Sequence, residues 1–346
     1  MRIKELSKQE GIMLKGIAIL LVIMHNYCHE FSFAVEANEF TWIKDNITLF
    51  NQQLLSLDNN LIVHAFSFGG HYGVVLFLFV SGYGLVRKYE SSNGNELKSI
   101  VFIWNHYCKL FKLMIIGFFA NMVVNKLCIG YFLHDSWTIP GQLSFLINII
   151  PSAHINPGPY WYLGMILQLY TLYRIFLYNR NSMYVILLTL ICILLQLICN
   201  PNGDVIYWLR RNFIGNLLPF ALGILYARYY SRLSNINISI TLTILISILI
   251  YVSNFFFILW ILSPIFVIPV TIYIIKIISK CTFLTSGLTN VGKISAYIFI
   301  THSIVHWILL PSDDKHPHIY LYLILYLILC ISMGYLYSLL LKKLKF

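Results

Sequence analysis

Charge is what this sequence has least of. Only 11% of its 346 residues are charged, whereas 59% are apolar or aromatic. This composition lies far outside that of a soluble globular domain. The seven cysteines stand singly, with no CxxC pair, so the sequence indicates neither a disulfide framework nor a zinc knuckle. An internal repeat and a glycine-rich nucleotide-binding loop are also absent from the sequence.

Long apolar runs are what the sequence has instead. Lipid leaves no backbone polar group unpaired, and these runs lack the alternation of a porin strand, so each is predicted to be a helix that crosses about 30 Å of hydrocarbon. We therefore predict an all-α, polytopic membrane protein with about ten transmembrane helices in one domain, residues 1–346. The ten runs are residues 12–28, 71–88, 110–129, 160–178, 183–199, 209–228, 236–253, 256–278, 293–311 and 318–341.

The distribution of Lys and Arg predicts how the chain is oriented. Of the 24 cations, 19 fall on one face of the predicted bundle. Because cations gather on the cytoplasmic side, both termini are expected there, with the long connections 29–70 and 130–159 outside. The net charge of +11 then reflects topology, and no nucleic-acid partner is expected. The five outer cations are Lys44, Lys126, Arg210, Arg211 and Lys315.

A histidine lies in the middle of the first apolar run. His25 stands ten residues after Lys15, which places it about 15 Å deep in a helix. An ionisable group at that depth is costly and so suggests a function, here that of a general base. Three alternatives stay open: a structural histidine, a zinc site with Cys28 and His29, and activation of Cys28 as a nucleophile.

Two further sets of polar residues lie at a comparable depth. His302 stands nine residues after Lys293, hence about 14 Å deep and nearly level with His25. Ser81, Gly82 and Tyr83 lie somewhat nearer the cytoplasm. The glycine would let either a neighbouring helix or a ligand approach closely.

Five sequence blocks resemble the acyltransferase 3 family of membrane-bound bacterial acyltransferases, in the family's order and over nearly the whole chain. They are KGIAILLVIMH at 15–25, GVVLFLFVSGYGL at 73–85, PYWYLGMILQLYTLY at 159–173, LLPFALGILYAR at 217–228 and ISAYIFITHSIV at 294–305. The family's functional cation and histidine of the first helix match Lys15 and His25. Nine residues separate them here, whereas many members have ten.

The resemblance implies an O-acetyltransferase of the bacterial inner membrane. Its partners would be membrane lipid, acetyl-CoA as a cytoplasmic co-substrate, and an envelope polysaccharide or lipid-linked sugar whose hydroxyl is acetylated. No metal and no other cofactor are expected. The alternative is a carrier or flippase for lipid-linked sugars that performs no acyl transfer; no inverted repeat supports it.

The site expected from this function has a catalytic base, a donor side and an acceptor side. His25 would be the base, while Tyr83 or Asn26 would stabilise the oxyanion. On the donor side we expect Ser81, Gly82 and Tyr83 near the thioester, with CoA phosphates held by cations. Trp161, Arg210, Arg211 and His302 are the remaining pocket candidates, and the two arginines would suit an anionic or polar acceptor. The cations proposed for the phosphates are Lys15, Arg87, Lys88, Lys109 and Lys112.

Overall fold

The fold is all-helical, as predicted. The computed structural model describes residues 5–35, 37–90, 98–130, 138–151, 155–233, 239–309 and 318–344, and this part of the chain contains helices and no strands. Each of the ten apolar runs contains helix; the start of the seventh, at 236–238, and the end of the ninth, at 310–311, lie outside the described residues.

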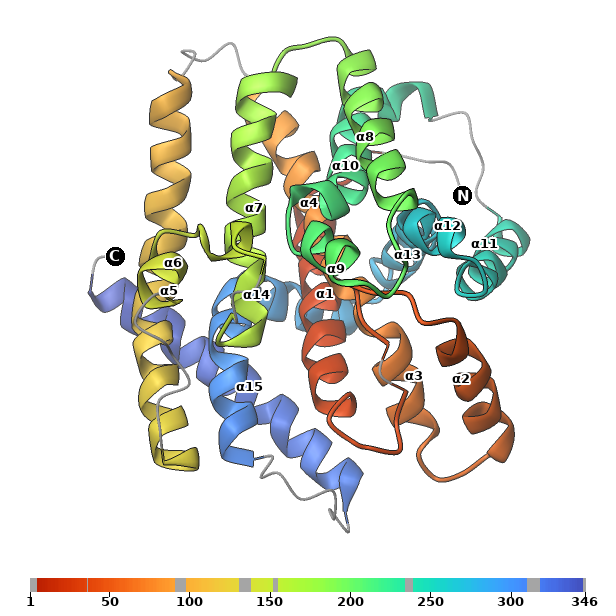
Figure 1. Ribbon diagram of the computed structural model, residues 1–346, viewed down its shortest axis with the longest axis vertical. Coiled ribbons are helices and arrows are strands. Elements are labelled where there is room, and N and C mark those ends of the chain that lie inside the picture. The colour runs from red at the N-terminus through yellow and green to blue at the C-terminus, as the bar shows by residue number, and fades with distance from the viewer. Residues whose placement is uncertain are drawn as a thin grey trace.

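One set of helices follows the apolar runs (Figure 1). The eighth run is split at Ser263, directly before Pro264, because proline lacks the N–H that would continue the helical hydrogen bonds. These helices are α1 (Lys8–Cys28), α4 (Tyr72–Tyr89), α5 (Ser99–Ile129), α7 (Trp161–Leu172) with a π-helical turn at Tyr173–Leu177, α8 (Ser182–Leu197), α10 (Phe213–Leu233), α11 (Ile240–Ser253), α12 (Phe257–Leu262), α13 (Pro264–Ile278), α14 (Thr282–Leu309) and α15 (Ile319–Lys343).

Several short helices lie in the connections. The first long connection carries two of them, which pack against each other and through α3 against α1. The short elements are α2 (Lys44–Ser56), α3 (Leu61–Gly69), α6 (Thr138–Leu143) and α9 (Asp204–Arg210), with 3-10 turns at Ile147–Ile149 and Gly158–Tyr160.

In the part of the chain that the structure describes, three helices are long and apolar enough to cross a membrane by themselves. They are α1, α5 and α15, and the bent pair α3 and α4, which meet at 43°, passes the same test as one unit. These helices agree with a membrane protein. Ten crossings and cytoplasmic termini stay predictions.

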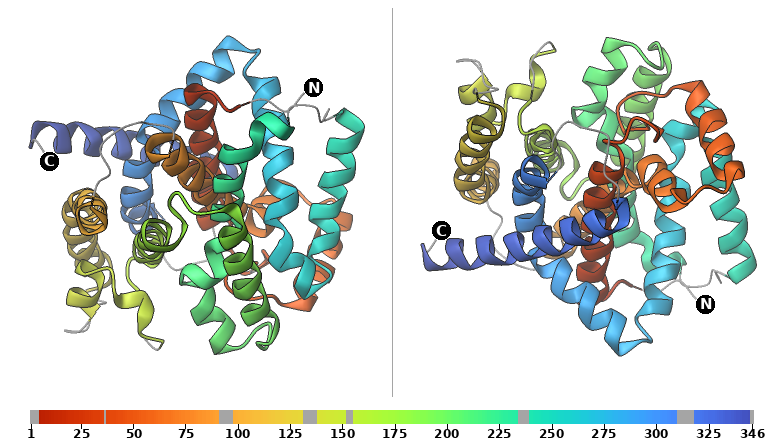
Figure 2. Two further views of the ribbon diagram at one scale, coloured as in Figure 1. Left: turned by 90° about the horizontal axis from the view of Figure 1, so that it is seen from above. Right: turned by 90° about the horizontal axis from the view of Figure 1, so that it is seen from below.

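Helix α1 lies near the middle of the helical bundle (Figures 1 and 2). It packs against α14, α4 and α3, while α4 packs against α10, and α10 against α8. The N-terminus of α1 is fixed by a capping box, in which Glu10 N donates to Ser7 Oγ (3.1 Å) and Ser7 N donates to Glu10 Oε2 (2.8 Å). Glu10 also pairs with Lys276 of α13 at 2.6 Å. Together these contacts fix the position of α1 along its own axis.

The sixth apolar run is two helices rather than one. Leu209 and Arg210 end α9, and α10 begins at Phe213. Between them Asn212 donates to the carbonyls of Asn148 and Trp208, both at 2.9 Å. These side-chain bonds compete with a continuous helix, which explains why the apolar pattern gave too early a start for this run.

Candidate active site

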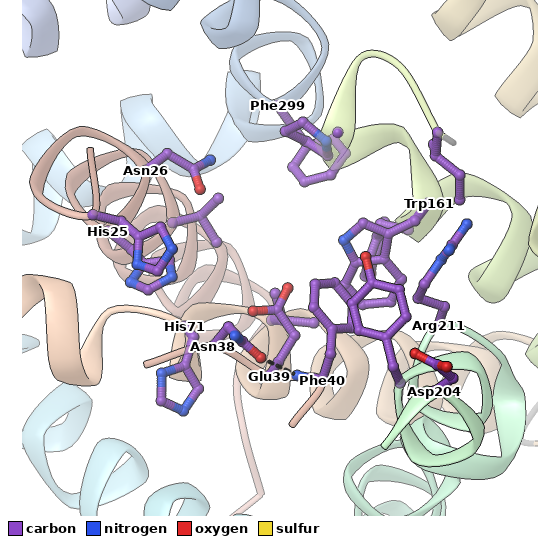
Figure 3. Close-up of a pocket in the computed structure, with 18 of the residues that line it drawn as sticks. His25, Asn26, Asn38, Glu39, Phe40, His71, Trp161, Asp204, Arg211 and Phe299 are labelled. Carbon is purple, nitrogen blue, oxygen red and sulfur yellow. Dashed lines mark hydrogen bonds between the residues drawn. The ribbon is translucent and has the colours of Figure 1, made fainter. Parts of the chain in front are cut away.

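A cavity of about 710 Å³ lies beside the C-terminal end of α1 (Figure 3). The first turn of α4, the segment before α2, the segment leading into α7, and α9 with the residue that follows it supply the other walls. The lining residues are Val22, His25, Asn26, His29, Asn38, Glu39, Phe40, His71, Val74, Pro151, Ile155, Gly158, Pro159, Trp161, Tyr162, Asp204, Tyr207, Arg211 and Phe299.

His25 lies in the last turn of α1 and is only 7% exposed. Its Nδ1 is 3.2 Å from the carbonyl oxygen of Phe66 in α3. Because a carbonyl can only accept, the neutral ring carries its proton on Nδ1 and leaves the lone pair on Nε2. A side chain added to Gly70 would collide with Cβ of His25, so the Gly70 backbone packs directly against the base of the His25 side chain. His25 is thus held as the tautomer that a general base requires.

Asn26, the next residue, is oriented by His302 of α14. Its Nδ2 is 2.9 Å from His302 Nε2, and His302 Nδ1 is 2.8 Å from the Phe299 carbonyl. The Phe299 carbonyl again fixes the tautomer, so His302 Nε2 accepts from the Asn26 amide. One N–H of that amide is used in this bond and the other is left for a ligand in the cavity.

Two more histidines lie beside His25. The ring centroids of His29 and His71 are 5.1 and 5.8 Å from that of His25. His71 is 5% exposed, and within the described ranges its Nδ1 has no hydrogen-bond partner. The described residues contain no group of three or more His, Cys, Asp or Glu side chains arranged to hold a metal ion.

Glu39 brings a carboxylate into the cavity from the first long connection. Burial raises its pKa to about 7, against a smaller opposing effect of the nearby Arg210. The segment around it is anchored on both sides. Asn38 Oδ1 accepts from Phe40 N (2.8 Å) and Thr41 N (3.0 Å), and Arg210 Nε donates to the Glu39 carbonyl.

Aromatic rings form one wall of the cavity. The ring of Phe40 lies 5.0 Å from that of Trp161 and 5.2 Å from that of Tyr207, centroid to centroid. The guanidinium of Arg211 lies 5.3 Å from the Tyr207 ring centroid. Asn148 Nδ2 donates to the carbonyls of both Trp161 (2.7 Å) and Arg211 (2.6 Å), which ties α7 to the end of α9.

The structure brings together four of the site residues expected from the sequence. His25, Asn26, Trp161 and Arg211 line the same cavity. His302 lies behind Asn26, as the equal depth of the two histidines predicts.

Arg210 is not part of the cavity wall. It donates to Gln196 Oε1 at 2.9 Å and its guanidinium lies 4.2 Å from the Trp260 ring centroid. Its contacts support the segment that carries Glu39.

The expected donor residues lie away from this cavity. Side chains added to Gly82 of α4 or Gly223 of α10 would collide with the carbonyls of Phe220 and Phe79, so both glycines serve close packing of these helices. Tyr83 donates to the Leu6 carbonyl at 2.8 Å. Ser81 is partly buried and Lys15 is exposed. Their role in donor binding stays a prediction.

Sequence reasoning missed Glu39, His71 and Asp204 as cavity residues. The unusual length of connection 29–70 was a signal that it carries function, but it does not say which residue turns inward. His71 directly precedes an apolar run, as an ordinary helix boundary would.

The cavity combines an oriented histidine, an amide and aromatic rings, in a chain whose described part contains helices long and apolar enough to cross a membrane. The model of the acyltransferase domain family matches residues 12–340, nearly the whole chain. The chain therefore belongs to the acyltransferase 3 family, as its sequence blocks predict. No curated protein and no solved structure matches it.

Proposed function

We propose that this membrane acyltransferase moves an acetyl group from acetyl-CoA to a hydroxyl of an envelope polysaccharide or lipid-linked sugar, with His25 as the general base. The proposal is carried by the bond from His25 Nδ1 to the Phe66 carbonyl, which leaves Nε2 unprotonated in a residue that lines a ligand-sized cavity. A sugar hydroxyl is a poor nucleophile until a base removes its proton.

The residues of the cavity support a complete transfer. Nε2 of His25 takes the hydroxyl proton while the sugar oxygen attacks the thioester carbonyl carbon. The negative charge on the carbonyl oxygen is stabilised by the remaining N–H of Asn26. When the carbon–sulfur bond breaks, the imidazolium returns the proton to the CoA thiolate. The products are the acetylated sugar and CoA, and no other co-reactant is needed.

The two substrates reach His25 from opposite sides in this proposal. Acetyl-CoA comes from the cytoplasm, with its phosphates near Lys15, Lys109 and Lys112, and the acceptor comes from the side of connections 29–70 and 130–159. Both termini are cytoplasmic, and the protein lies in the bacterial inner membrane. The exposed side chain of Lys15 supports this arrangement because it is accessible to a ligand.

Purified protein in liposomes tests the proposal. With radiolabelled acetyl-CoA as the only acyl donor, we expect protein-dependent release of CoA and transfer of label to glycan extracted from the native envelope. The matched control is the same preparation given labelled acetate. Movement of a lipid-linked sugar across the bilayer without any use of acetyl-CoA would show a carrier instead.

A further inference from the structure

The charged residues on the cavity wall indicate which charge the acceptor can carry. Two acids line the cavity, Glu39 and Asp204, and one permanent cation, Arg211, whose guanidinium is stacked on Tyr207. Arg210 does not line the cavity, but it lies behind Glu39, donates to the Glu39 carbonyl and partly offsets the charge of the Glu39 carboxylate. Among the described lining residues, the other groups that ionise near neutral pH are the histidines at 25, 29 and 71. With neutral histidines the wall is therefore more negative than positive.

The acid at position 39 is presented on a firmly anchored segment. Asn38 caps the two residues that follow Glu39, and Arg210 holds the Glu39 carbonyl. Trp42 extends the anchoring, since its Nε1 donates to the Asn254 carbonyl at 2.9 Å and its backbone N donates to the Pro201 carbonyl at 2.9 Å. A group fixed in this way before binding loses little entropy when a ligand arrives.

The aromatic part of the wall suits a sugar ring. Phe40, Trp161 and Tyr207 form a continuous aromatic surface beside the two acids. Ligand sites commonly combine such apolar surfaces with a few placed polar groups that set orientation and specificity. His71 adds a buried ring nitrogen that has no partner within the described ranges.

We propose that the cavity takes a sugar unit that carries no acid group, neutral or amine-bearing, stacked on Phe40, Trp161 and Tyr207 with Glu39 and Asp204 accepting its hydrogens. The inference rests on the proposed function and specifies its acceptor. Ionised carboxylates only accept hydrogen bonds, so they match hydroxyl and ammonium groups. An acidic sugar would place a third carboxylate among them, and that repulsion selects against it.

Three matched glycosides test this selectivity. We would titrate methyl β-D-glucoside, methyl β-D-glucosaminide and methyl β-D-glucuronide against the purified protein in lipid nanodiscs at pH 8, and measure binding by saturation-transfer NMR. The glucuronide is expected to bind about tenfold more weakly than the other two, or worse. In the double variant Glu39→Gln with Asp204→Asn the difference should shrink to about twofold, because the repelling charges are gone.

The control is Asp45→Asn, which removes an acid of the same connection that does not line the cavity. It should keep the full difference between glycosides. Equal or tighter binding of the glucuronide to wild type, or an unchanged difference in the double variant, would overturn the proposal. If none of the three glycosides binds while acetyl-CoA turnover is intact, the acceptor proposal fails and the proposed acyl transfer stands. If selectivity is found but acetyl-CoA is not turned over, the proposed function fails and the sugar site stands.

Discussion

The side-chain amide of Asn26 is hydrogen-bonded at 2.9 Å to Nε2 of His302, which joins α1 to α14 one residue beyond His25. The bond links two helices that are 276 residues apart in the chain. Asn26 and His302 have different roles, because only Asn26 lines the cavity.

Asn26→Ala should lower the turnover number for acetyl transfer by about a hundredfold or more, the usual cost of losing an oxyanion donor. Donor binding should change little, since the interaction forms only as charge develops on the carbonyl oxygen. Steady-state kinetics with varied acetyl-CoA separates the two effects. A rise in KM with an unchanged turnover number would show that Asn26 binds substrate instead.

His302 should behave as a positioning residue. His302→Ala removes the acceptor that orients the Asn26 amide, and we expect about a tenfold loss of turnover. His302→Gln should restore part of it, because a glutamine oxygen can accept the same hydrogen. Equal loss in both variants, with normal thermal stability, would contradict this role.

Glu39 should make the stability of the protein depend on pH. Its pKa in the folded protein is about 7, above the ordinary value of 4.5, because burial favours the protonated form. Between these two values the folded state binds more protons than the unfolded state, so stability falls as the pH rises. Thermal unfolding of wild type and Glu39→Gln from pH 4 to 8 measures this. The wild-type midpoint should fall relative to that of the variant across the interval, and parallel curves would contradict the assignment.

The apolar pattern predicted the helices well because burial in lipid demands continuous apolar runs, and every predicted run contains helix. Depth counting predicted that His25 and His302 lie at nearly the same level, and in the structure Asn26, the residue after His25, is hydrogen-bonded to His302. Glu39 and His71 could not be found in this way. Their position depends on how a connection folds back over the helices, which local periodicity does not encode. For Gly82 the sequence allowed either a ligand or a neighbouring helix to approach, and in the structure this glycine packs against α10.

Arg228 and Glu90 should be important for stability. The Arg228 Nε and Nη2 atoms contact the two Glu90 carboxylate oxygens at 2.9 and 2.7 Å, and their side chains are only 12% and 11% exposed. Tyr173 donates to the same carboxylate at 2.9 Å. Removing one partner of such a buried pair leaves an uncompensated charge, so Arg228→Ala should cost about 3–5 kcal/mol of folding free energy.

Thermal unfolding in one detergent checks this expectation. The double variant Arg228→Gln with Glu90→Gln should recover part of the loss because no lone charge remains. Arg232→Ala is the control, since the Arg232 side chain is exposed. An equal midpoint for wild type and Arg228→Ala would show that the pair contributes little.

Lys15 should act on the donor. Its side chain is exposed, and Lys15→Ala should weaken acetyl-CoA binding most at low salt, because ions screen a phosphate contact. Calorimetric titration of acetyl-CoA at two ionic strengths tests this, with Lys343→Ala at the end of α15 as a charge-matched control. An affinity equal to that of wild type at both ionic strengths would exclude Lys15 from the donor site.

The most direct test of the account is the rate of acetyl transfer from labelled acetyl-CoA by purified His25→Ala. Alanine removes the Nε2 lone pair and costs an apolar helix little. Because a general base contributes about a hundredfold or more, we expect the variant to retain less than about a hundredth of wild-type activity. Its thermal unfolding and acetyl-CoA affinity should stay close to those of wild type. Retention of more than about a tenth of the activity would contradict the account and make His25 a structural residue.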